Sequence, residues 1–280
     1  MRLETLLDGL VFGEGPRWHD GRLWLSDMHA QTVLTVDPDG KREDVLHVPG
    51  NPSGLGWLPD GRLLVVSMTD RKLLRREADG TLATHADLSA LARFHCNDMV
   101  VDARGRAFVG NFGFDLDAGE KPCPTELIRV DPDGRAVIAA REMRFPNGSV
   151  ITPDGTTLIV GESFGGCLTA FTIGEDGTLS GRREWARLEG AVPDGICLDA
   201  ENAVWVASPL SNEVLRVREG GAVTQRIPVG RPAIACMLGG PDRRTLFVLS
   251  ADSFRAEEAI QKRSARVELT RADVPGAGLP

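Results

Sequence analysis

The chain has 280 residues, of which 42% are hydrophobic, and its formal net charge is -8. This composition is typical of a soluble globular protein with a sizeable core, and it argues against nucleic acid as a partner because phosphate binding requires a basic stripe. No basic run followed by an apolar stretch opens the chain, and it contains no uncharged apolar segment of about 18 residues, so we expect a cytoplasmic protein that spans no membrane.

Cysteine usage points away from cross-links and thiolate metal sites. The chain has five cysteines, an odd number, and no two of them form a CxxC pair. Such a set favours neither a disulfide framework nor a zinc-type thiolate site. Cys167, Cys197 and Cys236 lie in or beside apolar segments, where we interpret them as small core residues.

A short unit recurs six times along the chain. Each copy has a polar residue, a strand, a turn about seven residues later, and two further strands. The copies begin near Glu14, Ser53, Asn97, Asn147, Asp194 and Cys236. They lie roughly 40 to 50 residues apart, which is the spacing of propeller blades.

The second strands of the units are the clearest elements, because Val, Leu, Phe and Trp fill them and turn residues bound them. They read RLWLSD, RLLVVSM, RAFVGNF, TTLIVGES, AVWVASP and RTLFVLS. Third strands such as LIRVDPDG follow and end in tight-turn residues. Only Asp87–Arg93 offers a turn or two of helix. The sequence therefore predicts an all-β fold, a six-bladed β-propeller with four-stranded antiparallel blades, as a single domain over residues 1–280.

The chain ends are expected to close the ring. A strand from one terminus must complete a blade built by the other, and the candidates are Arg2–Leu6 and Ala265–Leu269. The tail from Val274 onward, VPGAGLP, is too rich in Gly and Pro for a strand.

Strand direction predicts which face carries the chemistry. In an up-and-down blade, the start of the first strand and the end of the second strand lie on the same face. That face receives Glu14, Asn97, Asn147 and Asp194, one from each of four blades, near the propeller axis. An Asp or Asn before Gly is usually turn chemistry, but recurrence at equivalent points of four blades indicates a shared site. Converging carboxylate and amide oxygens are the ligands of a hard cation.

Several further residues are candidates for contacting a substrate on this face. Residues 112–124 form a long loop after the third blade's second strand, and its Phe112 and Phe114 either line a pocket or belong to a solvated excursion. His95 also lies there, with a simple surface histidine as the alternative. Asp98 follows Asn97 and points the other way, so it either supports the ligands or reaches the substrate.

Four motifs carry a resemblance to a known family, the senescence marker protein, gluconolactonase and luciferin-regenerating enzyme family. They are GEGPRW, FHCNDMVVD with RGRAFVGN, FPNGSVITPDG and PDGICLD, in the family's order and spacing. The resemblance implies a six-bladed propeller with one catalytic divalent cation. It also implies that Glu14, Asn147 and Asp194 are the ligands, while Asn97 completes the shell or holds the water and substrate.

The chain departs from that pattern at His95, where sugar-lactonase members often carry Arg. This departure, together with Phe112, Phe114, Phe164 and Met28 near the face, favours a less polar lactone or another ester over a sugar lactone.

The donor set and the resemblance together predict the chemistry. Two carboxylates with amide oxygens suit Ca²⁺ best, with Mg²⁺, Mn²⁺ or Zn²⁺ as alternatives. We expect hydrolysis of a small-molecule lactone by water held on the cation, with Asp194 or His95 as the base. No GxSxG motif supports a serine nucleophile. An organophosphate or other ester hydrolase on the same site, or a non-catalytic ligand-binding propeller, remains open, as do the substrate and the oligomeric state.

Overall fold

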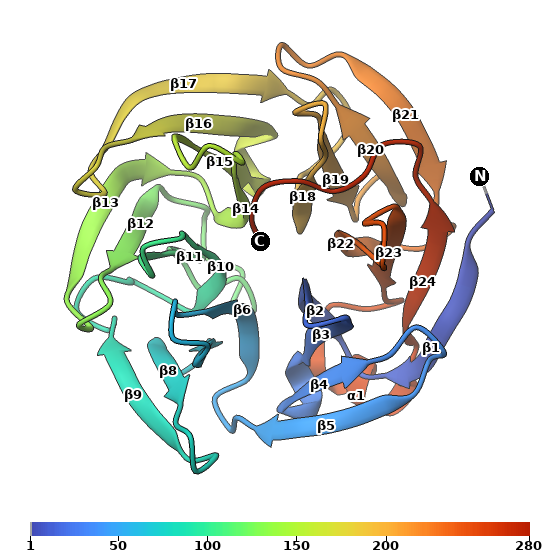
Figure 1. Cartoon of the computed structure of the whole chain (residues 1–280), viewed down its shortest axis with the longest axis horizontal. Helices are drawn as coiled ribbons and strands as arrows, with labels where there is room; N and C mark the ends of the chain where they lie inside the picture. Colours follow the sequence, from blue (N-terminus) through green and yellow to red (C-terminus); the bar gives the residue numbers. More distant parts are fainter. Residues whose placement is uncertain (1) are drawn as a thin grey trace.

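The strands form six four-stranded antiparallel sheets arranged in a ring, seen face-on in Figure 1. The computed structural model describes residues 2–280. Each blade starts with its innermost strand and proceeds outward, so the chain makes one circuit around the axis. This arrangement is the six-bladed β-propeller that the repeats predict.

The strands of the first three blades are as follows. Blade one contains β2 (Gly13–His19), β3 (Arg22–Asp27), β4 (Thr32–Val36) and β5 (Arg42–His47). Blade two contains β6 (Pro52–Trp57), β7 (Leu63–Ser67), β8 (Lys72–Arg76) and β9 (Leu82–Asp87). Blade three contains β10 (Cys96–Val101), β11 (Ala107–Asn111), β12 (Thr125–Val130) and β13 (Ala136–Met143).

The second half of the ring repeats this order. Blade four contains β14 (Pro146–Ile151), β15 (Thr157–Glu162), β16 (Cys167–Ile173) and β17 (Leu179–Arg187). Blade five contains β18 (Ile196–Leu198), β19 (Val204–Ser208), β20 (Glu213–Val217) and β21 (Val223–Pro228). Blade six contains β22 (Ala233–Gly239), β23 (Thr245–Ser250), β24 (Ala265–Arg271) and β1 (Glu4–Leu10).

Burial rises from the rim of the ring toward the axis. Every residue of β10, β14 and β22 is buried, whereas the outermost β5 and β21 are largely exposed or half-buried. Neighbouring blades pack their faces together, as Leu64 and Val66 of blade two do in one cluster with Met99 and Val109 of blade three. Each fully buried side chain of this size contributes about 1.5–3 kcal/mol.

Strands from both chain ends close the ring, as predicted. β1 pairs with β24 at the outer edge of blade six, and Glu4 lies opposite Leu269. Compared with the predicted Arg2–Leu6 and Ala265–Leu269, β1 begins at Glu4 and pairs as far as Leu10, and β24 continues to Arg271 by pairing with β23. The last blade is therefore held by hydrogen bonds between the first and last strands of the chain.

The C-terminal tail adds a second closure. It forms no strand, as its Gly and Pro content predicts, but it runs across the floor of the ring toward the axis (Figure 1). Hydrogen bonds tie it to blade five through Ala200 N to Pro275 O at 2.8 Å and to blade four through the Ile151–Leu279 pair at 2.8 and 2.9 Å.

The helices differ in part from the sequence expectation. Asp87–Arg93 makes only one hydrogen-bonded turn, in which the carbonyl of Leu88 accepts from the amides of Leu91 and Ala92. The helix that the sequence analysis missed is α1 (Ala256–Lys262), whose AEEAIQK sequence consists of helix-forming residues. Two short 3-10 turns, η1 (Met28–Ala30) and η2 (Ser163–Gly165), follow β3 and β15.

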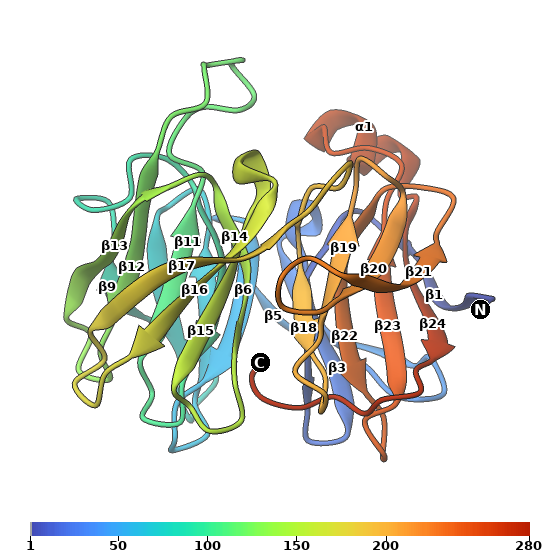
Figure 2. The same cartoon turned by 90° about the horizontal axis from the view of Figure 1, so that it is seen from above.

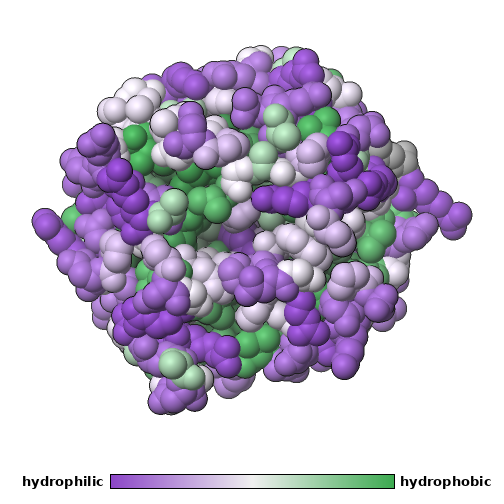
Figure 3. All heavy atoms as spheres, viewed as in Figure 1, coloured by the Kyte–Doolittle hydropathy of each residue, from purple (hydrophilic) through white to green (hydrophobic). Residues whose placement is uncertain are grey.

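The two faces of the ring are unlike each other. Figure 2 shows α1 and the long loop between β11 and β12 projecting from one face, with the C-terminal tail along the other. The face crossed by the tail, shown in Figure 3, is mostly hydrophilic around its rim and hollowed near the axis. The first strands of the blades start on the face that carries α1 and the long loop.

Removing residues 275–280 tests the role of the tail. Five backbone hydrogen bonds would be lost, and at about 0.5–1.5 kcal/mol each we expect the free energy of unfolding to fall by roughly 2.5–7.5 kcal/mol. Urea denaturation followed by circular dichroism measures this change. Removal of Pro280 alone, which spares those bonds, is the control, and equal stabilities of the three proteins would contradict the assignment.

Candidate metal centre

Backbone contacts between neighbouring inner strands bring the ligand candidates together. The amide of Gly148 donates to the carbonyl of Asp194 at 3.2 Å. A Cβ on Gly148 would lie 2.5 Å from that oxygen, and one on Gly15 would lie 2.6 Å from the carbonyl of Ser53. Only glycine allows this approach, so the residue after Glu14 and the residue after Asn147 fix how closely these side chains converge.

The four oxygen-bearing residues form one buried group at the start of the inner strands. Glu14, Asn97, Asn147 and Asp194 are each 3–8% exposed. The Asn147 amide nitrogen donates to Asp194 Oδ1 at 2.6 Å and to the Ser163 hydroxyl at 3.3 Å. These bonds fix the orientation of the Asn147 amide and turn its oxygen away from Asp194.

Two polar atoms of this group lack hydrogen-bond partners. Asn147 Oδ1 is buried and accepts no hydrogen bond, and Asn97 Nδ2 is buried and donates none. A buried amide oxygen without a donor is costly. A cation at this position would satisfy Asn147 Oδ1, so these residues fit a metal ion.

The pKa values of Glu14 and Asp194 also indicate a cation site. Burial raises the pKa of Glu14 well above its ordinary value, and the charges of Asp194 and Asp98 raise it further. Burial also raises the pKa of Asp194 to about 8, against the lowering effect of its hydrogen bond from Asn147 and with a further rise from Asp98. Without a cation, these carboxyl groups therefore resist ionisation.

Arg17 compensates one of the negative charges beneath the group. Its Nη2 lies 2.6 Å from Asp98 Oδ1, and both side chains are almost fully buried. Further bonds from the guanidinium to the carbonyls of Leu55, at 2.9 Å, and Met99 hold it across three blades. With Glu14, Asp194 and Asp98 all ionised, one guanidinium would leave two negative charges, which one divalent cation would neutralise.

Asp98 itself is engaged on that side of the strand. Besides Arg17, its Oδ1 accepts from the amide of Met99 at 2.8 Å. Oδ1 of Asp98 is therefore occupied by bonds within the protein.

The donor set is not of the thiolate or histidine type. Within residues 2–280, no three side chains among His, Cys, Asp and Glu are grouped to hold a metal ion. The candidate centre instead combines the carboxylates of Glu14 and Asp194 with amide oxygens. That mixture suits a hard cation.

Aromatic side chains flank the centre on the blade-three side. His95 is half-buried, and its ring stacks on Phe94 with a centroid distance of 4.0 Å and lies 5.9 Å from Phe112. Burial lowers the pKa of His95, although Asp117 and Asp115 act in the opposite direction. Phe114 is 2% exposed. His95 and Phe112 are therefore in ring contact, two positions before β10 residue Asn97 and just after β11, while Phe114 is buried in the loop that follows.

Sequence reasoning missed two residues of the site. Arg17 lies three positions after Glu14, where strict alternation would place it on the other side of the strand, but a register shift between them re-aims it. Phe145 precedes the Pro-Asn pair and was read only as part of a motif. Its backbone lies in the left-handed region, at a φ of 60°, and only the structure reveals this conformation.

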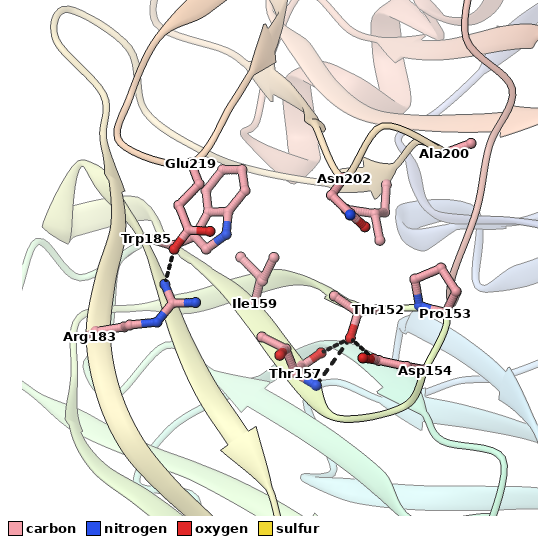
Figure 4. A pocket seen from close by; sticks show the side chains of 11 residues that line it. Thr152, Pro153, Asp154, Thr157, Ile159, Arg183, Trp185, Ala200, Asn202 and Glu219 are labelled. Atoms are coloured by element: carbon pink, nitrogen blue, oxygen red, sulfur yellow. Dashed lines mark hydrogen bonds and ion pairs between the residues drawn. The ribbon is translucent and has the colours of Figure 1, made fainter.

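A recess in the surface lies away from the candidate metal centre. It has a volume of about 430 Å³ and opens between blades four and five, where the β14–β15 and β18–β19 turns meet (Figure 4). An ion pair between Arg183 and Glu219 and a bond from the Thr152 hydroxyl to Asp154 occupy the polar groups of its wall. It is on the face opposite the four oxygen-bearing residues.

Gly148→Ala tests the inner-strand contact. The added methyl group would force β14 away from Asp194, so we predict that affinity for a divalent cation falls at least about tenfold, as expected for displaced ligands. Isothermal titration calorimetry measures the affinity. Gly155→Ala is the control: its added Cβ meets nothing within 4 Å, so any loss there reports backbone strain at a φ of 71° and not a displaced ligand. Equal losses in both variants would contradict the explanation.

Asp194→Asn tests the raised pKa. A carboxyl whose pKa is higher in the folded state stabilises the protein below its unfolded value and loses that contribution as the pH rises to about 8. In chelator, we therefore predict that the wild type loses stability relative to Asp194→Asn between pH 5 and 8, by up to about 1.4 kcal/mol per pH unit. Urea midpoints measure this, and parallel curves would show that the pKa is not raised.

Comparisons with known proteins find relatives over nearly the whole chain. Residues 12–252 match the SMP-30/gluconolactonase/LRE-like region. A 6-deoxy-6-sulfogluconolactonase of Pseudomonas putida is 29% identical, over 96% of this chain and 94% of that protein. A Xanthomonas campestris gluconolactonase structure is 25% identical with a TM-score of 0.77, over 98% of this chain and 89% of that chain.

A luciferin-regenerating enzyme has the same fold, with a TM-score of 0.84 and 20% identity over 99% of this chain and 98% of that chain. No helix within residues 2–280 is both long and apolar enough to cross a bilayer. Because the family match covers most of the chain, from the first ligand candidate to the last blade, this protein belongs to the SMP-30/gluconolactonase/LRE-like family.

Proposed function

We propose that this protein is a lactonase that depends on a divalent cation bound by Glu14, Asn147 and Asp194. The observation that carries the proposal is the buried Asn147 oxygen, which has no hydrogen-bond donor and lies beside two carboxyl groups that burial keeps from ionising. Membership of a family that includes gluconolactonases supports the reaction class.

The donor chemistry favours Ca²⁺, and Mg²⁺, Mn²⁺ or Zn²⁺ are alternatives to be tested. When bound, such a cation supplies Lewis-acid polarisation of a carbonyl oxygen and lowers the pKa of water. Asn147 contributes its free amide oxygen to this site and, through its nitrogen, holds Asp194 in place.

Two residues are proposed to act on the reacting atoms. The free N–H of Asn97 donates to the lactone carbonyl oxygen and stabilises the negative charge that develops there. Asp194 takes the proton of the attacking water, since Asn147 engages only its Oδ1. The proton then passes to the ring oxygen as the acyl C–O bond breaks, so one lactone and one water give one hydroxy acid.

Arg17 and Asp98 act in support. The guanidinium lowers the repulsion between Asp98 and the two carboxyl ligands, and its bonds to the carbonyls of Leu55 and Met99 keep blades one, two and three in register. We therefore propose a supporting role for Asp98 and reserve substrate contact for His95, Phe112 and Phe114.

Asp194→Ala is expected to lose both the cation and the activity while keeping the fold. We predict a fall in kcat of at least about a hundredfold, because a ligand and the proposed base are removed together. Inductively coupled plasma mass spectrometry gives the metal content, and a pH indicator follows acid release from lactones. Asp154→Ala, in a turn on the opposite face, is the control.

The outcomes separate the remaining readings. A variant that keeps stoichiometric metal would show that the ligand assignment is wrong. If chelation leaves lactone hydrolysis unchanged, the cation is not part of the reaction. If metal-loaded wild type releases acid from no lactone, a phosphoester hydrolase or a ligand-binding propeller takes the place of the lactonase.

A further inference from the structure

Exposed apolar side chains gather on the face that carries the candidate centre. In the part of the chain that the structure describes, the strongly exposed large hydrophobic residues are Leu116, Phe164, Leu210, Val223, Phe254 and Ile260. All but Val223 lie on α1 or on loops at the site face, as the strand ends place them. Single exposed apolar residues are ordinary, but five of the six on one face suggest that this face binds an apolar group.

Phenylalanine follows the same distribution. Phe108, Phe171 and Phe247 lie inside strands and pack between blades. The other seven stand just before inner strands or after second strands, at the site face: Phe12, Phe94, Phe112, Phe114, Phe145, Phe164 and Phe254. Phe12, Phe114 and Phe145 are buried there, whereas Phe164 and Phe254 are exposed.

Four of these rings form one group, the Phe cluster, consisting of Phe112, Phe114, Phe145 and Phe164. Phe145 lies in the middle, stacked on Phe112 with a centroid distance of 4.4 Å and lying 5.2 Å from Phe164 and 5.9 Å from Phe114. Phe164, at 46% exposure, is its open edge. The cluster stands between blades three and four, beside the turns that carry Asn97 and Asn147.

The backbone at the centre of the cluster is strained. Phe145 has a φ of 60°, which is an outlier for a bulky residue. Two backbone bonds hold it, from Ser163 N to Phe145 O at 3.1 Å and from Phe164 N to Arg144 O at 3.3 Å. In addition, the amide of Arg144 donates to the carboxylate of Glu162, Oε2, at 2.7 Å. Such strain persists where the surrounding structure imposes it, and it concentrates at functional sites.

Polar side chains at the same strand ends are occupied within the protein. The Asn111 amide bonds to the Thr125 hydroxyl at 2.6 Å and to the carbonyl of Glu126 at 2.6 Å. The Ser163 hydroxyl donates to the carbonyl of Pro193 at 2.7 Å. A polyhydroxylated ligand needs several free hydrogen-bonding groups around its ring, and these residues do not offer them.

We infer that the substrate is a lactone with an apolar alkyl or aryl substituent, which the Phe cluster binds while the ring carbonyl faces Asn97. This inference rests on the proposed function and names its substrate class. Phe145 positions the cluster, and Phe112 and Phe164 contact the substituent. Phe164, the exposed edge of the cluster, leaves room for a long substituent as well as a compact one.

A matched lactone series tests the inference on the cation-loaded full chain. We expect kcat/KM for γ-lactones that bear a hexyl or phenyl group to exceed that for unsubstituted γ-butyrolactone and for glucono-δ-lactone by at least about tenfold, from the apolar area buried. Equal or higher kcat/KM for glucono-δ-lactone would overturn the inference and leave the lactonase proposal standing.

Phe164→Ser tests whether the Phe cluster causes the preference for substituted lactones. Its side chain is exposed, so the fold is expected to survive. We expect about a tenfold loss of kcat/KM, mainly through KM, on the hexyl and phenyl lactones, and less than about a twofold change on γ-butyrolactone. Val223→Ser, an exposed position on β21 far from the site face, is the control. Equal losses on all lactones would overturn the assignment to the cluster.

A binding arm separates this inference from the reaction. Lactams of the same substituent series resist hydrolysis, and isothermal titration calorimetry measures their dissociation constants. If the phenyl lactam binds at least about tenfold more tightly than the unsubstituted lactam, yet no lactone is hydrolysed, the apolar site is real and the lactonase proposal fails. If the substituent changes neither binding nor turnover, the inference itself fails.

Discussion

The candidate site depends on the contact between neighbouring inner strands at the propeller axis. Gly148 can approach the carbonyl of Asp194 only because it has no side chain, and Gly15 approaches Ser53 in the same way. Each glycine directly follows a ligand candidate. The sequence pairs that look like ordinary turns therefore set the distance between oxygen atoms that belong to different blades.

Blade three lacks a glycine at this position and carries a charged residue there instead. Asp98 takes the place of a glycine after Asn97, so a third carboxylate enters a buried region that already holds Glu14 and Asp194. Arg17 offsets that charge from below. The pKa of Glu14 stays raised even so, and that of Asp194 is raised as well, so their ionised forms are unfavourable for the fold alone and are favoured if a cation completes the structure.

The sequence predicted much of the architecture because propeller repeats leave local marks. The second strands, the long loop of residues 112–124 and the closing strands near both ends could be placed from strand patterns and turn residues. The side of the strand on which Arg17 emerges could not, because a register shift breaks the two-residue alternation between Glu14 and Arg17. Helix α1 was missed because it is only two turns long and stands between two strands of one blade.

The site residues likewise differ in whether the sequence could predict them. Glu14, Asn97, Asn147 and Asp194 could be named because their positions repeat, whereas the internal bonds that occupy Asn111 and Ser163 depend on which loops meet in space. Substrate preference is therefore the part of the function that sequence patterns constrain least. The rings that shape it come from turns of different blades that no repeat relates.

The turn before β14 links the two halves of the site. It carries Phe145 in its strained conformation and, two residues later, Asn147 with its free oxygen. The bonds that hold Phe145 come from residues 163 and 164, and the Ser163 hydroxyl also accepts from Asn147 Nδ2. A change in the central ring would therefore move a ligand of the proposed cation as well. Phe164, at the open edge, is the one member of the cluster whose contact with a substrate can be altered without that consequence.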